Sequence, residues 1–527
     1  MIRRIKSNSL NLITEKNKEE EIQNYKTLFR SERTKGINDL DNSKSINDEG
    51  NNDYEKYNKD LDEDISYGNN KTKEIEILLS DPDLMDIIDD KEINDNHNQG
   101  GTFKKLISKM GEGSLRRLIL NLSTLNICVG SFNLPINMSY ASIYIYPILI
   151  IIIGIISHWT LNIFSKIYYR YKKVVYEEII KEFLFRPIIF IYYFLIVLKN
   201  FGNMVLEQII LYKLICDIFI KLDIADENFF SRTKNKYFII FGIAFFMLFP
   251  LFQIKTIDKI NQNIIFKITI LIIIILILLI NYISLFIINF DFTSSVKDKF
   301  KINKEYFLFE KNELFNSLVV LFYLFSYHDN FLELFQILKI PSQRRVSKII
   351  NRAIIIDIII YLIIAIIGYF CLPFDMIKEL IIFRNVEYEE NHIFNDCLMA
   401  YGRIIYLIYL LFDILKNYNN LRIIILISIC GFYREKISMN LIFSFCALLF
   451  ASLIAVNFQY ISEFICLIGA LCSAYISFII PLIIYIRENE NSEFHWKNIF
   501  TFFLIIILFV ISSSSLFFTI KKIIDYL

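Results

Sequence analysis

Apolar runs that are long enough to cross a bilayer recur along most of this chain. A helix rises 1.5 Å per residue, so about 20 residues cross the hydrocarbon core. The pattern predicts an all-α multi-pass membrane protein with about eleven transmembrane helices. We expect them at roughly 115–141, 143–165, 187–217, 237–254, 263–289, 313–338, 348–373, 396–416, 437–457, 461–486 and 497–520. The apolar run 421–433 is too short to span and is predicted to be an interfacial or buried segment between two helices.

Residues 1–110 have the opposite character. They are rich in Asn, Asp, Glu, Lys and Ser, and such a segment cannot bury enough apolar area to offset the entropy lost on ordering. We therefore expect a disordered tail at 1–110 and an eleven-helix domain at 111–522. Lys and Arg gather in alternate loops, for example at 166–186 and 339–352, so the positive-inside rule predicts that the N-terminus is cytosolic.

Composition excludes several classes of protein. Hydrophobic residues make up 55% of the 527 residues, which argues against a soluble globular fold. The net charge of +1 provides no field that would attract nucleic acid. The eight cysteines form no CxxC pair, so neither a metal site nor another cofactor is expected. Cys371 and Cys397 should lie near one membrane face, either as a disulfide or as two free thiols.

The first predicted helix is interrupted in its middle by the segment NICVGSFNLPINMSY. Pro135 lacks an N–H group and disturbs the preceding turn, while Gly130 permits a close approach to the backbone. In lipid, a helix that is interrupted at mid-membrane usually lines a protein cavity. We predict a solute-binding site formed here by Val129, Gly130, Ser131, Phe132 and Asn133.

The sixth predicted helix carries consecutive polar residues, Ser326 to Asn330, at mid-span. Ionisable groups that face lipid are costly, so this segment should border water or a ligand. We predict that Phe325, Ser326, Tyr327 and His328 belong to the same site. The first and sixth helices occupy corresponding positions if helices 1 to 5 and 6 to 10 are inverted repeats, an arrangement that puts the substrate beside two broken helices.

Several motifs resemble the amino acid/auxin permease (AAAP) family. The opening CVGSFNLP and the block FSYHDNFLELFQILKIPSQRRVSKIINRAIIIDIIIYLIIAIIGYF are similar to the family's first, sixth and seventh helices. The segments FPLFQIKTIDKI at 249–260 and CLIGALCSAYISFIIPLIIYI at 466–486 are similar to the ends of its fourth and tenth helices. The resemblance implies a LeuT-like 5+5 inverted repeat and an amino acid substrate.

The sequence departs from sodium-coupled relatives at the positions that would hold the ion. Thr124 stands where they have Asn in the first helix, and LMAYGRIIYLIYLLFDIL in the eighth has neither Ser nor Thr. Proton-coupled symport or uncoupled exchange is therefore favoured. His328 could act as a proton-linked gate with Asp329, although a buried structural histidine has the same pattern. Asn203 and Glu207 share a face of the third helix with Lys199 and either line the pathway or form a structural polar stripe.

These features predict an amino acid transmembrane transporter that works by alternating access, either secondary active or facilitative. The expected partners are an amino acid, protons and the lipid bilayer. Two alternatives stay open: a carrier of other small amines or cationic drug-like solutes, and a non-transporting amino acid sensor. With five His and no HExxH motif, an enzyme is not expected. Residence in the plasma membrane and in a vacuolar or other endomembrane fit equally, and the abundance of Ile, Asn and Lys suggests an AT-rich genome such as that of an apicomplexan parasite.

Overall fold

The computed structural model covers most of the predicted membrane domain. All described residues belong to one compact unit, Gly100–Leu527. They are 114–124, 129–171, 176–221, 229–230, 232–253, 269–270, 272–280, 311–329, 331, 338, 342–370, 380–383, 392–430, 437–458, 460–488 and 496–526. The predicted tail at 1–110 lies outside these residues, as does Cys371, so the predicted alternatives of a Cys371–Cys397 disulfide and two free thiols both stay open.

Helix is the regular secondary structure throughout these ranges, and no strand occurs within them. The elements are α5 (Leu115–Thr124), η1 (Ser131–Asn133), α6 (Leu134–Ala141), α7 (Ile145–Tyr171), α8 (Tyr176–Phe183), α9 (Arg186–Lys221), α11 (Thr233–Gly242), η2 (Ile243–Leu248), α12 (Phe249–Gln253), α16 (Lys311–Leu324), α18 (Gln343–Phe370), η4 (Ile381–Phe383), α19 (His392–Cys430), α20 (Ile437–Asn457), α21 (Ile461–Ile468), η5 (Gly469–Ser473), η6 (Tyr475–Ile479), α22 (Ile480–Glu488) and α23 (Trp496–Tyr526).

Seven helices in the described part of the chain are long and apolar enough to cross a membrane, which confirms the prediction of an all-α multi-pass membrane protein. They are Ile145–Tyr171, Pro187–Ile220, Lys234–Gln253, Gln343–Tyr369, Ser438–Asn457, Ile461–Glu488 and Trp496–Asp525. The first and sixth predicted spans are present as shorter helical pieces because each is interrupted. Most of the fifth, 263–289, lies outside the described residues, so the total of eleven stays a prediction.

The expected boundary between the eighth helix and a separate segment at 421–433 is wrong. Helix α19 continues without a break from His392 to Cys430, over 39 residues. The apolar run ends near 416, which is why the sequence predicts the end of the span there. The polar stretch KNYNN at 416–420 is nevertheless helical. A helix can leave the hydrocarbon and continue through the polar interface, where water or protein groups solvate its side chains.

Two π-helical segments, in which the helix is wider than an α-helix, end shortly before a proline. The π-helix η2 ends at Leu248, two residues before Pro250, and the π-helix η6 ends at Ile479, two residues before Pro481. A proline removes one N–H group and its ring crowds the carbonyl of the preceding turn. Pairing from residue i to i+5 accommodates this disruption locally, so both helices cross their prolines without ending.

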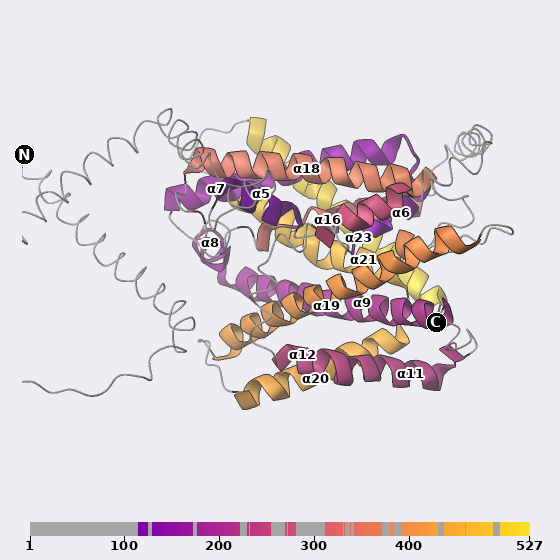
Figure 1. Ribbon diagram of the computed structural model, residues 1–527. Helices are drawn as coiled ribbons and strands as arrows, with labels where there is room; N and C mark the ends of the chain where they lie inside the picture. The colour runs from indigo at the N-terminus through magenta and orange to yellow at the C-terminus, as the bar shows by residue number, and fades with distance from the viewer. Residues whose placement is uncertain are drawn as a thin grey trace, which may run out of the picture. The chain divides into compact units, whose positions relative to one another are not determined.

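Helix α16 lies among elements from both halves of the domain. It contacts α6 and α7 on one side and α21, η5 and α23 on another, while α18 packs along α5, α6 and α7 (Figure 1). Helix α19 runs beside α9, and α20 lies against α11 and α12 (Figure 1). Any side chain at the end of α16 is therefore enclosed by several helices.

Candidate functional site

The first span is broken where the sequence predicts. Helix α5 ends at Thr124, residues 129–130 form a turn, and the short 3-10 helix η1 leads into α6. Pro135 stands in the first turn of α6, where its missing N–H group would have had no helical partner in any case. The proline thus starts a new helix rather than bending a continuous one.

The second break follows α16, which ends at Leu324. Phe325 is in a turn, and Ser326 and Tyr327 are not helical. Three successive carbonyl groups receive hydrogen bonds from side chains of three other helices. Tyr361 Oη of α18 donates to Leu324 O over 3.2 Å, Ser157 Oγ of α7 donates to Phe325 O over 3.1 Å, and Lys199 Nζ of α9 donates to Ser326 O over 3.4 Å. These donors satisfy backbone groups that would otherwise be costly in a low-dielectric interior.

The two breaks meet at Gly130. A Cβ atom built on this glycine would lie 2.8 Å from Leu324 Cδ2 and 2.8 Å from Tyr323 Cδ1. Contacts this short do not occur between real side chains, so only glycine fits here unless its neighbours move. The predicted residues of the first break are therefore adjacent to the end of α16.

Lys199 is the centre of a buried polar cluster at the second break. Its Nζ lies 3.0 Å from Asp329 Oδ2 and 2.9 Å from Ser326 Oγ. The hydroxyl groups of Ser326 and Ser477 are 2.6 Å apart, which joins η6 to the cluster. The Lys199 and Asp329 side chains are only 7% and 8% exposed, so each charge depends on the other for its stabilisation.

The neighbouring residues His328 and Tyr327 are also buried and contact different helices. His328 Nε2 lies 2.9 Å from Thr160 Oγ1, and the imidazole packs against the rings of Phe164 and Phe478. Its Nδ1 has no hydrogen-bond partner among the described residues. Tyr327 Oη donates to Asp357 Oδ2 over 2.6 Å.

Tyr176 is a further buried residue whose electrostatics are affected by Asp329. It lies in α8, between two predicted spans, and its hydroxyl donates to Ile476 O of η6 over 2.5 Å. Burial raises the pKa of the Tyr176 hydroxyl, and the nearby charge of Asp329 adds to that rise. The hydroxyl therefore keeps its proton and remains a donor.

The remaining residues of the first break contact α19 and α21. Asn133 Nδ2 donates to Ser462 Oγ of α21 over 2.7 Å, and Asn137 Nδ2 donates to Asn133 O over 2.8 Å. Phe132 packs edge-on against Tyr406 of α19. Residues 131–133 thus reach α19 and α21, whereas Ser326 and His328 reach α7, α9 and η6.

The two third-helix candidates separate in the structure. Asn203 Oδ1 accepts a hydrogen bond of 3.2 Å from Tyr323 Oη, directly above the break in α16. Glu207 is buried but faces α19, where its Oε1 accepts a hydrogen bond of 2.7 Å from Asn417 Nδ2. The polar stripe of α9 therefore contacts two partners, and only its Lys199–Asn203 part adjoins the predicted site.

All nine predicted substrate residues, Val129 to Asn133 and Phe325 to His328, are buried. A solute could reach them only after the surrounding helices separate. Sequence reasoning missed Ser157, Thr160, Ser477 and Asp357, which complete the polar surroundings. Asp357 could have been found because it is a single carboxylate within the apolar run AIIIDIIIY, where an ionisable residue normally has a specific partner.

Within the described ranges, no group of three or more His, Cys, Asp or Glu side chains could hold a metal ion.

Comparison with known families identifies the family of this chain. A model of the family described as transmembrane amino acid transporter protein matches residues 111–525. The chain belongs to this family. The match confirms the resemblance to amino acid permeases, whose members are transporters rather than enzymes, and it assigns amino acid transport across a membrane to this integral protein. No curated protein matches the sequence. The family match carries no information on the source organism, so an apicomplexan origin stays a prediction.

Proposed function

We propose that this transporter carries its amino acid by alternating access and binds it where the two broken spans meet. The observation that carries this proposal is the contact of Gly130 with Tyr323 and Leu324, which brings the two interrupted segments together inside the bundle. The helix is interrupted by a turn at 129–130, and an interrupted span lines a cavity in many transporters, so the backbone around Gly130 and Ser131 is the proposed site of the substrate carboxylate. The segment Ser326–His328 then faces the amino group or the side chain.

The burial of all nine residues fits this mechanism. A carrier must close its site to both sides during the cycle, and the described conformation gives solvent almost no access to these side chains. Uptake then requires one group of helices to move against another, as the predicted inverted repeat would allow.

Coupling to sodium is disfavoured by Lys199. Its ammonium group already occupies the Ser326 carbonyl and hydroxyl and the Asp329 carboxylate, which are the oxygen types that a hard cation would take. We propose proton coupling instead, with His328 as the group that accepts the proton. Support comes from His328 Nδ1, which has no hydrogen-bond partner among the described residues.

Uptake of radiolabelled amino acids into proteoliposomes tests the substrate and the site. We expect uptake of at least one common amino acid, with Gly130→Ala reducing it at least tenfold because the added methyl group has no space. Gly242→Ala is the matched control, since a Cβ there meets nothing within 4 Å. No uptake of any common amino acid by the intact protein would refute the substrate, and transport of amines alone would favour the amine carrier.

A pH gradient tests the coupling. Inward-directed protons should stimulate uptake in the unaltered protein, and replacement of sodium by choline should leave it unchanged. His328→Gln should retain exchange of substrate but lose the stimulation, whereas His158→Gln should keep it. Equal stimulation in both variants would rule out His328 as the proton acceptor.

A further inference from the structure

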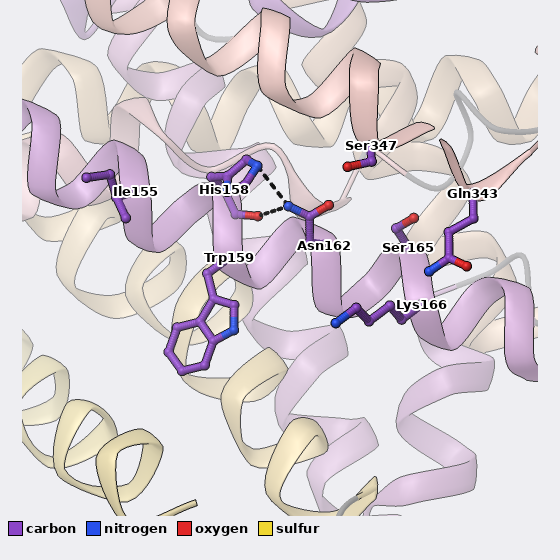
Figure 2. Close-up of a pocket in the computed structure, with 8 residues that line it drawn as sticks. All are labelled: Ile155, His158, Trp159, Asn162, Ser165, Lys166, Gln343 and Ser347. Atoms are coloured by element: carbon purple, nitrogen blue, oxygen red, sulfur yellow. Dashed lines mark hydrogen bonds between the residues drawn. The ribbon is translucent and has the colours of Figure 1, made fainter. Parts of the chain in front are cut away.

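A cavity of about 390 Å³ opens between α7 and α18, away from the broken spans. Figure 2 shows its eight lining side chains: Ile155, His158, Trp159, Asn162, Ser165, Lys166, Gln343 and Ser347. The Asn162 amide donates to both Nε2 and the carbonyl oxygen of His158 at 2.9 Å, which fixes the middle of the cavity (Figure 2). None of the eight side chains is acidic.

The cavity changes character along the helix axis. Ile155 and Trp159 form one end, and Lys166 and Gln343 form the other (Figure 2). Eleven residues of helix separate Ile155 from Lys166, which corresponds to about 16 Å along the axis. This length matches the distance from the headgroup level to the middle of a bilayer, about half of its 30 Å core.

The apolar end is open to the hydrocarbon. Ile155 is 59% exposed, and it continues a row of exposed isoleucines on both helices. These are Ile148, Ile151 and Ile152 on α7 and Ile355 and Ile359 on α18. An occupant with an acyl chain could therefore enter from the membrane.

The polar end has the chemistry of an anion site. The Lys166 side chain is exposed there, and Arg344, Arg345 and Lys348 follow Gln343 in the first two turns of α18. Ser165 is 2% exposed, and its Oγ has no hydrogen-bond partner among the described residues although it lines the cavity. A buried hydroxyl without a partner is costly, and a phosphate oxygen would satisfy it.

We infer that this cavity binds one anionic phospholipid, with the headgroup at Lys166 and Ser165 and an acyl chain along Ile155 and Trp159. Basic pockets between transmembrane helices are suited to anionic headgroups, especially on the cytoplasmic side, which is the side predicted for this end of α7. The site is separate from the proposed amino acid site, so either proposal can fail without the other.

Tryptophan fluorescence provides a direct test because the chain has two Trp residues. Trp159 lines the cavity, whereas Trp496 is 85% exposed at the start of α23. Trp496→Phe in the full-length protein leaves Trp159 as the reporter. We expect brominated phosphatidylserine, diluted into unlabelled phosphatidylcholine nanodiscs, to quench Trp159 more strongly than brominated phosphatidylcholine does.

Variants that remove one positive charge test whether the lipid preference arises at the cavity. Lys166→Gln should reduce the preference for the anionic lipid by about fivefold, the contribution expected from one basic residue near the headgroups. Lys181→Gln, an exposed lysine of α8 outside the cavity, should leave the preference unchanged. Equal quenching by the two lipids, or equal effects of the two variants, would overturn the inference. So would loss of the preference on adding soluble glycerophosphoserine at the same concentration as the lipid, because the ligand would then be a soluble phosphate ester.

Discussion

Lys199 and Asp329 are two ionised side chains held inside an apolar bundle. Charges in such a place are expensive unless they are paired and hydrogen-bonded. Here the pair is 3.0 Å apart, and Ser326 supplies two further oxygens to the ammonium group. The ion pair therefore fixes the position of the second break relative to α9.

A double-mutant cycle on this pair should show strong coupling. Lys199→Met or Asp329→Asn alone should lower the free energy of unfolding by about 3–5 kcal/mol, because each leaves one buried charge without its partner. The double variant should recover most of that loss. Lys181→Met, which breaks an exposed pair with Glu177, should cost at most about 1 kcal/mol. Denaturation in mixed micelles measures all four variants, and additive effects of the two single changes would refute the coupling.

Sequence reasoning identified Lys199, Ser326 and Asp329 of this cluster but neither Ser477 nor the contacts among the four residues. Lys199 and Asn203 were placed on one helix face by their spacing, and Asp329 was placed in the sixth span. Which of them meet depends on how α9 rotates against α16, and periodicity within one helix does not contain that information. Glu207 is an example: it lies on the same face of α9 as Lys199 and Asn203, yet it accepts a hydrogen bond from Asn417 of α19.

At the scale of elements, the second break is stabilised from outside the helix that contains it. The donors Ser157, Lys199 and Tyr361 come from three helices and each donates a hydrogen bond to one carbonyl of 324–326. The unwound segment is thus a product of tertiary packing as much as of its own polar sequence.

Removing one donor should destabilise the break. Ser157→Ala leaves Phe325 O without its side-chain donor in a buried place, so we expect a loss of about 1–3 kcal/mol in unfolding free energy and slower uptake. Ser139→Ala is the matched control, because Ser139 Oγ bonds to Ile136 O within its own helix, and it should change stability by less than about 0.5 kcal/mol. If the two variants unfold alike in the same micelles, the carbonyl is satisfied in another way.

The ends of helices could be predicted where proline, glycine or a run of polar residues interrupts an apolar span. Pro135 and Gly130 marked the first break, and the polar run Ser326–Asn330 marked the second. The end of α19 was not predictable from hydropathy, because the polar residues 416–420, which precede its apolar last turns, fit a helix outside the hydrocarbon as well as a loop. The prolines Pro250 and Pro481 indicate a local disturbance of their helices. They do not distinguish a π-helix from a kink or from the end of the helix.

At the scale of the whole molecule, the last helix is held by polar contacts to two others. Lys522 Nζ of α23 lies 3.2 Å from Glu313 Oε1 of α16 and 3.0 Å from Glu463 Oε1 of α21. One and two turns earlier, Thr519 and Ser515 donate to Asn316 Oδ1 of α16. These contacts hold α23 against the rest of the bundle, although only 22% of its most apolar stretch is buried.

Lys522→Met should loosen this attachment. It leaves Glu313 and Glu463 near each other without their shared cation, and we expect a loss of about 1–2 kcal/mol after allowance for the partial exposure of the lysine. The adjacent Lys521 is exposed, so Lys521→Met should change stability by less than about 0.5 kcal/mol. Thermal unfolding in micelles compares the two, and equal melting temperatures would show that Lys522 does not hold α23.

The three donors around the second break bear on the helix movements that the proposed alternating access requires. Because α7, α9 and α18 each donate a hydrogen bond to one carbonyl of the same short segment, any tilt of α16 away from one of these helices breaks a hydrogen bond inside the bundle. A half-completed movement is therefore less stable than either end point. We expect the protein to interconvert abruptly between two well-populated arrangements, and the rate of that jump should respond to these three side chains more than to the thickness of the surrounding bilayer.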